Sequence, residues 1–291
     1  MTFTRYETPK TFGADVLDIL LADEVQNNLP IGFIRNERRA DTSGWLLASV
    51  KNGNGGVVLT AACTPPNNII LYETGNTPND AALQLLSDEL KSMGFTVPGV
   101  MCEQGLASRF AGVYAGAGSY QPFHTMTIMR LDQVTQPPNA PGRYRHATQN
   151  DLHFLPYWER TFGEECGIGY NAVEAHAAKI RDIVGKVPWF LWEDGCPVSQ
   201  ASNRRNTENG AVVTAVYTPP HFRGKGYATS VVATLSQHLL DRGSKFCCLF
   251  ANADNPISCG IYRKMGYRDL CLYQSYTFTN AADSSYNTSN S

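Results

Sequence analysis

Apolar residues along this chain follow two kinds of spacing, and each kind predicts a different element. Continuous or alternating apolar runs, rich in β-branched and aromatic residues, predict strands at 44–50, 56–63, 189–192, 211–217 and 245–250. Apolar residues three and four positions apart predict helices at 15–28, 80–93, 171–184, 227–242 and 256–265. Shorter strands are expected at 143–148, 197–201, 267–273 and 276–279. The chain therefore mixes strands and helices over most of its length.

The most informative stretch is 211–229, which predicts a strand, a glycine-containing loop and a helix N-terminus. Pro219-Pro220 ends the strand, and Arg223-Gly224-Lys225-Gly226 forms a loop of small and basic residues. Free backbone N–H groups and the positive end of the helix would face the same space, which suits phosphate or pyrophosphate. The loop lacks the spacing of a P-loop, and Thr229 stands where a dinucleotide fingerprint needs its third glycine.

Two short motifs resemble signatures of the GNAT N-acetyltransferase superfamily. Arg223 to Ala228, R-G-K-G-Y-A, resembles the Q/R-x-x-G-x-G/A loop that binds the pyrophosphate of acetyl-coenzyme A. Asn255 to Tyr267 matches a second signature, N-x-x-S/A-x-x-x-Y/F-x-x-x-G-F/Y, with Asn255 as the expected N-cap of a short helix. Arg145 to Asp151 reads R-x-A-T-x-x-D, as in the first strand and helix of such a domain, and Asn150 or Asp151 is expected to cap that helix. The resemblance is carried by residues from about 143 to 279.

An internal likeness predicts that this fold occurs twice. The pattern T-A-x-x-T-P-P stands at Thr60–Pro66 and again at Thr214–Pro220, each time after an apolar strand. The arrangement resembles tandem GNAT proteins. It implies an α+β (three-layer α/β) fold of two GNAT-like domains, each a mixed, mostly antiparallel twisted sheet with helices on both faces. Directly after Pro66 the first copy has Asn67-Asn68-Ile69-Ile70-Leu71, with no arginine and no glycine, so we expect that it does not bind coenzyme A.

Composition and resemblance together predict the domain limits. A degenerate GNAT-like domain is expected at 1–132, a proline-rich linker at 133–142, an N-acetyltransferase domain at 143–279 and a disordered tail at 280–291. The degenerate domain is expected to cover or shape the active site of the other one.

The resemblance also assigns roles to residues. Backbone groups at Val216-Tyr217-Thr218, where two central strands splay apart, would hold the pantetheine arm and polarise the thioester. Tyr262 would protonate the departing thiolate as general acid, because a phenol with a pKa of about 10 carries its proton at neutral pH. The loop amides would hold the pyrophosphate, basic side chains would add charge, and Asn255 would bind the pantetheine arm. The implied cofactor-binding residues are Val216, Tyr217, Thr218, Arg223, Gly224, Lys225, Gly226, Tyr227, Ala228, Thr229 and Asn255.

The sequence leaves the catalytic base and part of the function open. The candidate bases are glutamates in the region where the family builds its acceptor site: Glu159, Glu164, Glu165 and Glu193. Each of them has an ordinary surface position as the alternative interpretation, and His221 is interpreted as a surface residue. The implied function is direct transfer of an acetyl group from acetyl-CoA to the amine of a small molecule or peptide in a ternary complex. The alternative is a non-catalytic acyl-CoA-binding or regulatory module on the same scaffold.

Composition narrows the classes of partner and compartment. The 291 residues carry a net charge of −2, which gives no reason to expect binding to nucleic acid or to a membrane surface. Eight cysteines include no C-x-x-C pair, so no metal site is expected. No apolar run of membrane-spanning length and no signal-peptide pattern appears, so we expect a cytoplasmic protein with reduced thiols. The expected partners are acetyl-CoA and an amine, and the chain is expected to be a monomer with two pseudo-equivalent halves or a homodimer.

Overall fold

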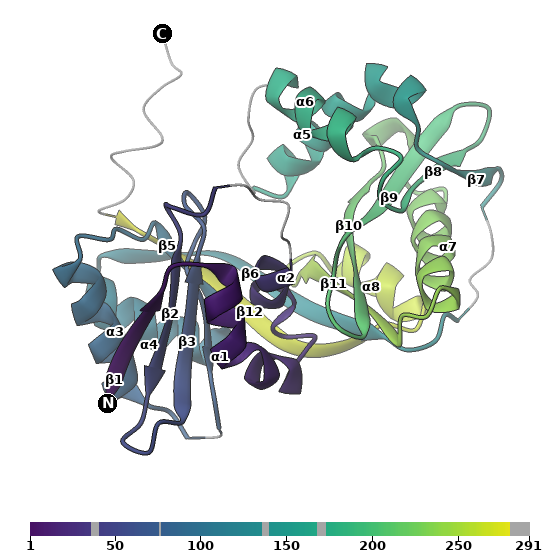
Figure 1. Cartoon of the computed structure of the whole chain (residues 1–291). Coiled ribbons are helices and arrows are strands. Elements are labelled where there is room, and N and C mark those ends of the chain that lie inside the picture. The colour runs from purple at the N-terminus through teal and green to yellow at the C-terminus, as the bar shows by residue number, and fades with distance from the viewer. Residues whose placement is uncertain (36–40, 76, 136–139, 168–172, 280–291) are drawn as a thin grey trace, which may run out of the picture. The chain divides into compact units, whose positions relative to one another are not determined.

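Two series of elements follow each other in the same order: one strand, two helices, three strands, then helix, strand, helix and strand. The computed structural model describes residues 1–35, 41–75, 77–135, 140–167 and 173–279 (Figure 1). The first series is β1 (Thr2–Tyr6), α1 (Pro9–Ala22), α2 (Asn28–Arg35), β2 (Leu46–Lys51), β3 (Val57–Cys63), β4 (Ile70–Glu73), α3 (Asp80–Ser92), β5 (Gly99–Glu103), α4 (Gln104–Ala115) and β6 (Tyr120–Leu131). The second is β7 (Arg143–His146), α5 (Leu155–Glu165), α6 (Val173–Ile183), β8 (Trp189–Glu193), β9 (Pro197–Asn206), β10 (Gly210–Tyr217), α7 (Tyr227–Asp241), β11 (Phe246–Asn252), α8 (Pro256–Lys264) and β12 (Arg268–Phe278).

The strands form two sheets, and the chain divides into two compact units. One sheet has the order β1-β2-β3-β4, and the other has the order β5-β12-β6-β11-β10-β9-β8-β7. Unit 1 consists of Met1–Ile128, Ala251–Asn255 and the chain from Leu270, whereas unit 2 consists of Met129–Phe250 and Pro256–Asp269. Most neighbouring strands are antiparallel, with β10 and β11 as a parallel pair. The α+β class and the tandem GNAT-like architecture are therefore confirmed.

In unit 1, alternate residues of the four-stranded sheet point to helices on opposite faces. Leu46 and Ala48 of β2 belong to the apolar core that also contains Leu83 of α3 and Phe110 of α4. Leu47, between them in sequence, belongs to a separate core with residues of α1 and α2. Because side chains alternate across a strand, this pattern places one pair of helices on each face.

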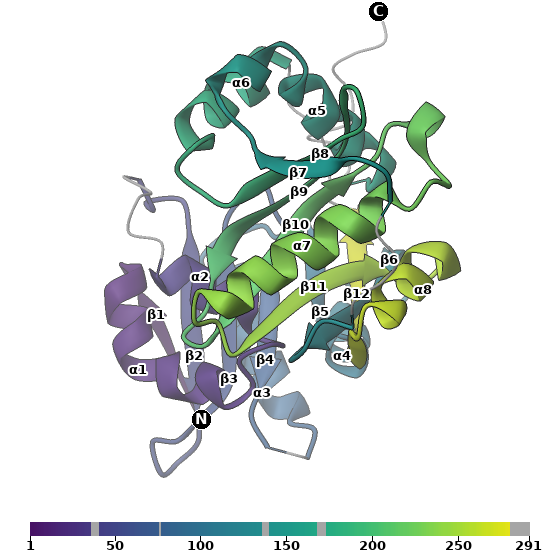
Figure 2. The same ribbon diagram turned by 90° about the vertical axis from the view of Figure 1, so that its right-hand side faces the viewer.

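In unit 2, α7 covers one face of the sheet, while α5 and α6 cover the other. Trp189 and Leu191 of β8 pack with Leu155 of α5 and Ile180 of α6. Phe190, between them, lies against His238 of α7, with 5.0 Å between ring centroids. Figure 2 shows α7 lying along the eight-stranded sheet. The predicted sheet with helices on both faces is thus present in each unit.

Some predicted boundaries were wrong. The helix expected at 15–28 is α1, which begins at Pro9 behind a Thr8 capping box and ends at Ala22. The two closing strands expected at 267–273 and 276–279 form the single strand β12. Neither Asn150 nor Asp151 is an N-cap. Thr148 caps the short 3-10 helix η1 (Gln149–His153), in which Asp151 is the third residue.

The repeated T-A-x-x-T-P-P segment does not mark corresponding positions. Thr60–Pro66 lies at the end of β3, the third strand of its series, whereas Thr214–Pro220 lies at the end of β10, the fourth. The element that corresponds to β10 is β4, which is followed by α3 as β10 is followed by α7. The segment to compare with the glycine loop is therefore the β4–α3 connection, 74–79. The duplication is real, but it is visible in the order of elements and not in that motif.

Candidate active site

The loop between β10 and α7 leaves the start of the helix open. Gly226 is the N-cap residue of α7, and it has left-handed backbone angles with φ of 81°. Gly224 also has positive φ, 78°, which glycine adopts without steric cost. Glycine has no side chain that accepts the first N–H groups of α7, at Tyr227, Ala228 and Thr229. These amides and the helix dipole would favour an anion here, and the binding of a pyrophosphate stays a prediction.

The second half of β10 departs from regular pairing. Its parallel register with β11 runs from Gly210↔Phe246 to Val212↔Cys248. Towards β9 the register shifts between Thr214 and Tyr217, and Ala215 between them has φ of 52°. Such a bulge turns backbone groups out of the ladder. Val216, Tyr217 and Thr218, expected to hold the pantetheine arm, follow this irregular point directly.

Arg223 is held between the end of β10 and the end of α5. Its Nε donates to the Thr218 carbonyl oxygen at 2.8 Å, and its Nη2 donates to both Glu165 carboxylate oxygens at 2.7 Å. Ser199 Oγ lies 2.8 Å from Thr218 Oγ1 and fixes the same turn from β9. Lys225 is exposed. The loop thus offers one cation held by hydrogen bonds, Arg223, and one exposed cation, Lys225, whose ammonium lies 6.0 Å from the centroid of the Phe222 ring.

The first residue of α7 is tied to the β8–β9 turn. Tyr227 is buried, and its hydroxyl donates to Asp194 Oδ2 at 2.5 Å. This contact fixes the direction in which α7 leaves the loop.

Tyr262, the expected general acid, lies on α8 with its side chain buried. Burial raises the pKa of Tyr262 to about 12, and a hydrogen bond with Ser258 lowers it by less. The Cys166 thiol lies close enough to raise the same pKa slightly, and Cys166 follows Glu165 at the end of α5. The end of α5 is therefore tied to Arg223 through Glu165, and Cys166 adds a small electrostatic effect on Tyr262. Asn255 precedes the first residue of α8 and belongs to unit 1, so its part in the site stays a prediction.

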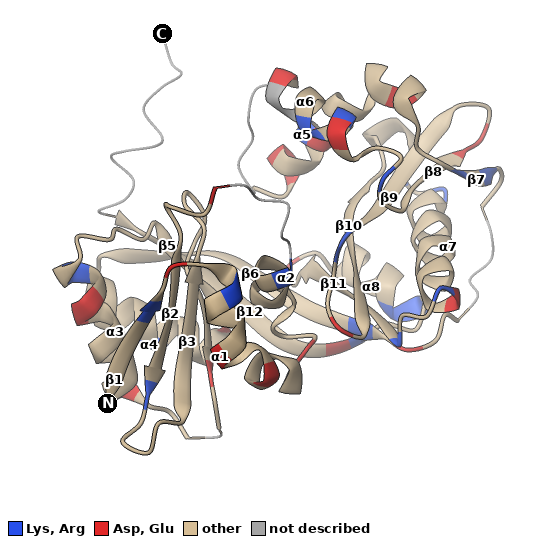
Figure 3. Ribbon diagram, in the orientation of Figure 1, with Lys and Arg blue, Asp and Glu red and all other residues tan. Residues whose placement is uncertain are grey.

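Each candidate base forms an ion pair with an arginine, and three of the four glutamates lie on α5, one of the elements on which Figure 3 marks acidic and basic residues. The pairs are Glu159–Arg204 at 2.6 Å, Glu164–Arg160 at 2.8 Å, Glu165–Arg223 at 2.7 Å and Glu193–Arg145 at 2.6 Å. Pairing alone therefore does not single out one of them as the base.

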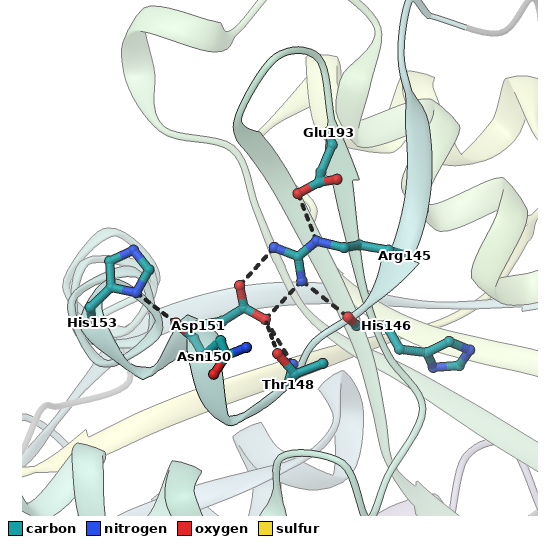
Figure 4. A network of polar contacts seen from close by, with 7 residues as sticks. All are labelled: Arg145, His146, Thr148, Asn150, Asp151, His153 and Glu193. Carbon is teal, nitrogen blue, oxygen red and sulfur yellow. Dashed lines mark hydrogen bonds and ion pairs between the residues drawn. The ribbon is translucent and has the colours of Figure 1, made fainter.

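The Glu193–Arg145 ion pair belongs to a network of polar contacts around the start of η1, the short helix that precedes α5 (Figure 4). Arg145 Nε donates to Glu193, and its Nη1 and Nη2 donate to the two carboxylate oxygens of buried Asp151 at 2.8 and 2.7 Å. Asp151 also accepts from the Thr148 backbone N–H at 2.7 Å. This arrangement is structural and closes the start of η1. Glu193 is a weak candidate for the base because the same network uses it.

A buried polar cluster beneath α5 was missed by the sequence analysis. Glu159 accepts from Gln200 Nε2 at 2.8 Å and from Arg204 Nη1 at 2.6 Å, and the Arg204 guanidinium stacks over Trp189 at 4.3 Å. A register shift between Val212 and Val213 lies opposite Arg204 and aims it at this face. The signal was present in β9, a mostly buried strand that is unusually rich in polar residues, with Gln200 and Ser202 opposite Leu191 and Trp189 of β8.

The described residues contain no group of His, Cys, Asp and Glu side chains arranged to hold a metal ion. No helix among them is both long and apolar enough to cross a membrane. The predicted loop residues and Tyr262 all lie within unit 2, together with the polar cluster.

Comparison with known proteins identifies the fold. Residues 197–276 match the FR47-like protein family, and no curated protein matches the chain. A GCN5-related N-acetyltransferase from Sphaerobacter thermophilus is 17% identical with a TM-score of 0.65, covering 94% of each chain. A tandem GNAT protein from the clavulanic acid biosynthesis pathway is 14% identical with a TM-score of 0.61, covering 95% of this chain and 97% of its own. An acetyltransferase of the GNAT family from Colwellia psychrerythraea is 12% identical with a TM-score of 0.60, covering 96% and 100%. The chain has the GNAT acetyltransferase fold in tandem.

Proposed function

We propose that this chain, which has the tandem GNAT fold, transfers the acetyl group of acetyl-CoA to an amine by direct transfer in a ternary complex. The observation that carries the proposal is the open start of α7. Gly226 caps it without a side chain, and Arg223 and Lys225 stand beside it. A pyrophosphate there would accept hydrogen bonds from the free amides and neutralise the cations.

The neighbouring elements supply the rest of a binding path for acetyl-CoA. The bulge in β10 interrupts its ladder next to the loop, where backbone groups of Val216 to Thr218 would hold the pantetheine arm and the thioester oxygen. The carbonyl oxygens of Tyr217 and Thr218 already accept from Ser199 Oγ and Arg223 Nε, so the remaining backbone groups would serve. Gly224 to Thr229 would hold the pyrophosphate, and Asn255 would bind the pantetheine arm.

The reaction needs one proton to move from the amine to the sulfur. The nitrogen lone pair attacks the thioester carbon, the N–C bond forms, and the C–S bond breaks with its electron pair going to sulfur. Tyr262 would donate its phenolic proton to that sulfur. With a pKa of about 12 the phenol is a weaker acid than a thiol of pKa about 8.5, so the proton lost by the amine must return to Tyr262 to complete the step.

The alternative is a module that binds acyl-CoA without turnover. One observation favours it: Tyr262 is only 8% exposed, so its hydroxyl reaches a thioester only if its surroundings open. In that case the loop would bind the cofactor and the buried tyrosine would serve packing alone.

Calorimetric titration of acetyl-CoA tests the cofactor site. Binding should be micromolar in the native chain and lost in Arg223→Glu. Arg242→Glu, which changes an exposed arginine at the opposite end of α7, is the matched control and should bind normally. No binding by the native chain would reject the proposal and the alternative together.

Tyr262→Phe separates the enzyme from the binding module. In an enzyme it should lower kcat by about 100-fold, as the loss of a general acid does, with little change in the Kd of acetyl-CoA. Thiol release measured with a panel of amines gives kcat, and the melting temperature shows whether the variant remains folded. A native chain that binds acetyl-CoA but releases no thiol with any amine would establish the alternative.

A further inference from the structure

The polar cluster beneath α5 contains buried hydrogen-bonding atoms that the protein leaves unpaired. They are Nε and Nη2 of Arg204, Nε1 of Trp189 and Oε1 of Gln200. Trp189 and Gln200 are fully buried, and the Arg204 side chain is 20% exposed. Leaving buried polar groups without partners costs free energy, so such a group in a native fold calls for a specific explanation.

The geometry of the unpaired atoms is specific. Arg204 uses Nη1 for Glu159, which leaves the Nε–H and Nη2–H edge of its planar guanidinium without a partner. That edge presents two parallel donors, which match the two oxygens of a carboxylate. The Trp189 ring lies against the same guanidinium, and its indole N–H is a third unpaired donor. Gln200 contributes only an acceptor, since its amide nitrogen is bound to Glu159.

The cluster lies next to the place where the thioester is expected. Gln200 is paired in register with Tyr217 across β9 and β10. Tyr217 lies on the α5 face, where its ring packs against Trp158 with centroids 5.9 Å apart. A molecule bound to the cluster would therefore have one end beside β10 and the other beside Arg204.

The charges favour a particular kind of molecule. Glu159 and Arg204 neutralise each other, so the buried cluster has no net charge. A cation entering alone would bring an uncompensated charge into this environment, which is costly. A molecule that carries both an ammonium and a carboxylate adds no net charge.

From these observations we propose that the acceptor is an amino acid or a related small amino-carboxylate. Its carboxylate binds the free edge of Arg204 and the indole N–H of Trp189. Its amino group donates to Gln200 Oε1 and faces Tyr217. Glu159 does not react but holds Gln200 and Arg204 in place. This inference rests on the proposed acetyl transfer and names the substrate class for it.

Matched pairs of amines test the proposal on the native chain. Each pair consists of an amino acid and the amine without its carboxylate, such as glycine with methylamine, leucine with isopentylamine and phenylalanine with phenethylamine. Thiol release should favour the carboxylated member by about 100-fold in kcat/KM per neutral amine, because a site built for a polar group strongly rejects analogues that lack it. Equal rates within the pairs would overturn the inference and leave an internal water as the partner of the cluster.

Variants of the cluster provide the second test. Arg204→Lys keeps the charge but loses the two-donor edge, and it should raise KM for the carboxylated amine by about 30-fold with kcat changed much less. Lys186→Gln, which removes an exposed cation outside the cluster, is the control and should leave both values unchanged. Melting temperatures identify variants that fail to fold, and the pairwise comparison on the native chain decides in that case.

Calorimetry distinguishes a failure of the acceptor assignment from a failure of the proposed acetyl transfer. An amino acid should bind to the complex of the protein with CoA, and its decarboxylated partner should bind at least 30-fold more weakly. Binding of acetyl-CoA without this selectivity overturns only the acceptor assignment. Failure to bind acetyl-CoA removes the proposed function and the acceptor assignment with it.

Discussion

The N-termini of α3 and α7 occupy corresponding positions in the two units, yet a side chain caps α3 and no side chain caps α7. At α3, the Asn79 side chain accepts from the Ala82 N–H at 3.1 Å, and the Asn79 N–H donates to Glu73 Oε1 at 2.8 Å. Asp80 adds an acidic residue to the first turn. At α7, Gly226 supplies no capping side chain.

This difference shows what would favour or oppose an anion at the N-terminus of a helix in this fold. Carboxylates and amides of the chain complement the positive end of α3, so a phosphate there would meet Glu73 and Asp80. Arg109 pairs with both of these carboxylates and so does not remain available for a ligand. At α7 no side chain caps the first amides, and Glu165 pairs with Arg223 of the loop.

The largest effect is expected from giving α7 a capping side chain like that of α3. Gly226→Asp places a carboxylate at the N-cap, where it satisfies the amides and repels phosphate. We expect the affinity for acetyl-CoA to fall by about 1,000-fold, or about 4 kcal/mol. Calorimetry measures the affinity. A Cβ at Gly226 meets only Ala140 Cβ at 3.7 Å, so space is adequate and the left-handed backbone is the main cost to stability.

Gly226→Asn is the matched control for charge. Asparagine tolerates left-handed angles and caps a helix as aspartate does, but it carries no charge. It should lower the affinity by only about 10-fold. Equal losses in the two variants would mean that backbone geometry, and not electrostatic repulsion, explains the effect.

The N-terminus of η1 is also capped, and a change there should alter stability without altering the binding of acetyl-CoA. In Asp151→Asn, an amide group would replace the buried carboxylate, and the Arg145 guanidinium would keep only Glu193 as a charged partner. We expect a loss of about 3 kcal/mol in the free energy of unfolding, and little change in acetyl-CoA affinity when the protein is folded. Urea denaturation measures the loss. Asp182→Asn, which removes an exposed ion pair with Lys186, should cost less than about 0.5 kcal/mol.

The same carboxylate predicts a dependence of stability on pH. Burial raises the pKa of Asp151, but hydrogen bonds from Arg145 and Thr148 outweigh burial and bring the pKa below its ordinary value. A carboxyl with a lowered pKa in the folded state stabilises the fold above its unfolded pKa of about 3.9, and that contribution is lost as the pH falls further. Urea denaturation between pH 3 and pH 7 should therefore show the difference between the native chain and Asp151→Asn shrinking below about pH 4. A constant difference would contradict this linkage.

The smallest effect is expected from removing the N-cap of α3. Asn79→Ala removes the cap and should destabilise the protein by about 1 kcal/mol. Acetyl-CoA affinity should be unchanged, since the α3 start is not expected to bind the cofactor. A measurable change in that affinity by calorimetry would show that the two starts are coupled.

The sequence predicted what depends on neighbouring residues. Gly226 could be assigned to a helix start because a strand, two prolines and an amphipathic helix surround it within twenty residues. The helix at 80–93 and the strand at 56–63 were placed within one or two residues for the same reason. α1 was misplaced because its start depends on Thr8 and Thr11, whose reciprocal hydrogen bonds leave only a weak signal in the sequence.

Features that depend on distant contacts could not be predicted. The positive φ of Ala215 is an irregularity that alanine does not prefer, so it reflects the packing of β10 and no local signal. The bulge at Arg204 and its contact with Glu159, 45 positions away, are of the same kind. The proposed acceptor site is made almost wholly of such contacts, which is why the sequence alone indicated the cofactor but not the acceptor.

The pairing of β12 with β5 has a consequence for how the protein is made. Tyr273 to Thr277 pair antiparallel with Gly99 to Glu103, so unit 1 is completed by residues near the other end of the sequence. During translation, one edge of β5 waits for its partner while roughly 170 further residues are synthesised, which takes on the order of 10 to 30 seconds. An exposed strand edge is a template for pairing with other chains. Expression of the first 132 residues alone would make that exposure permanent, so the first half is a poor choice for an isolated fragment.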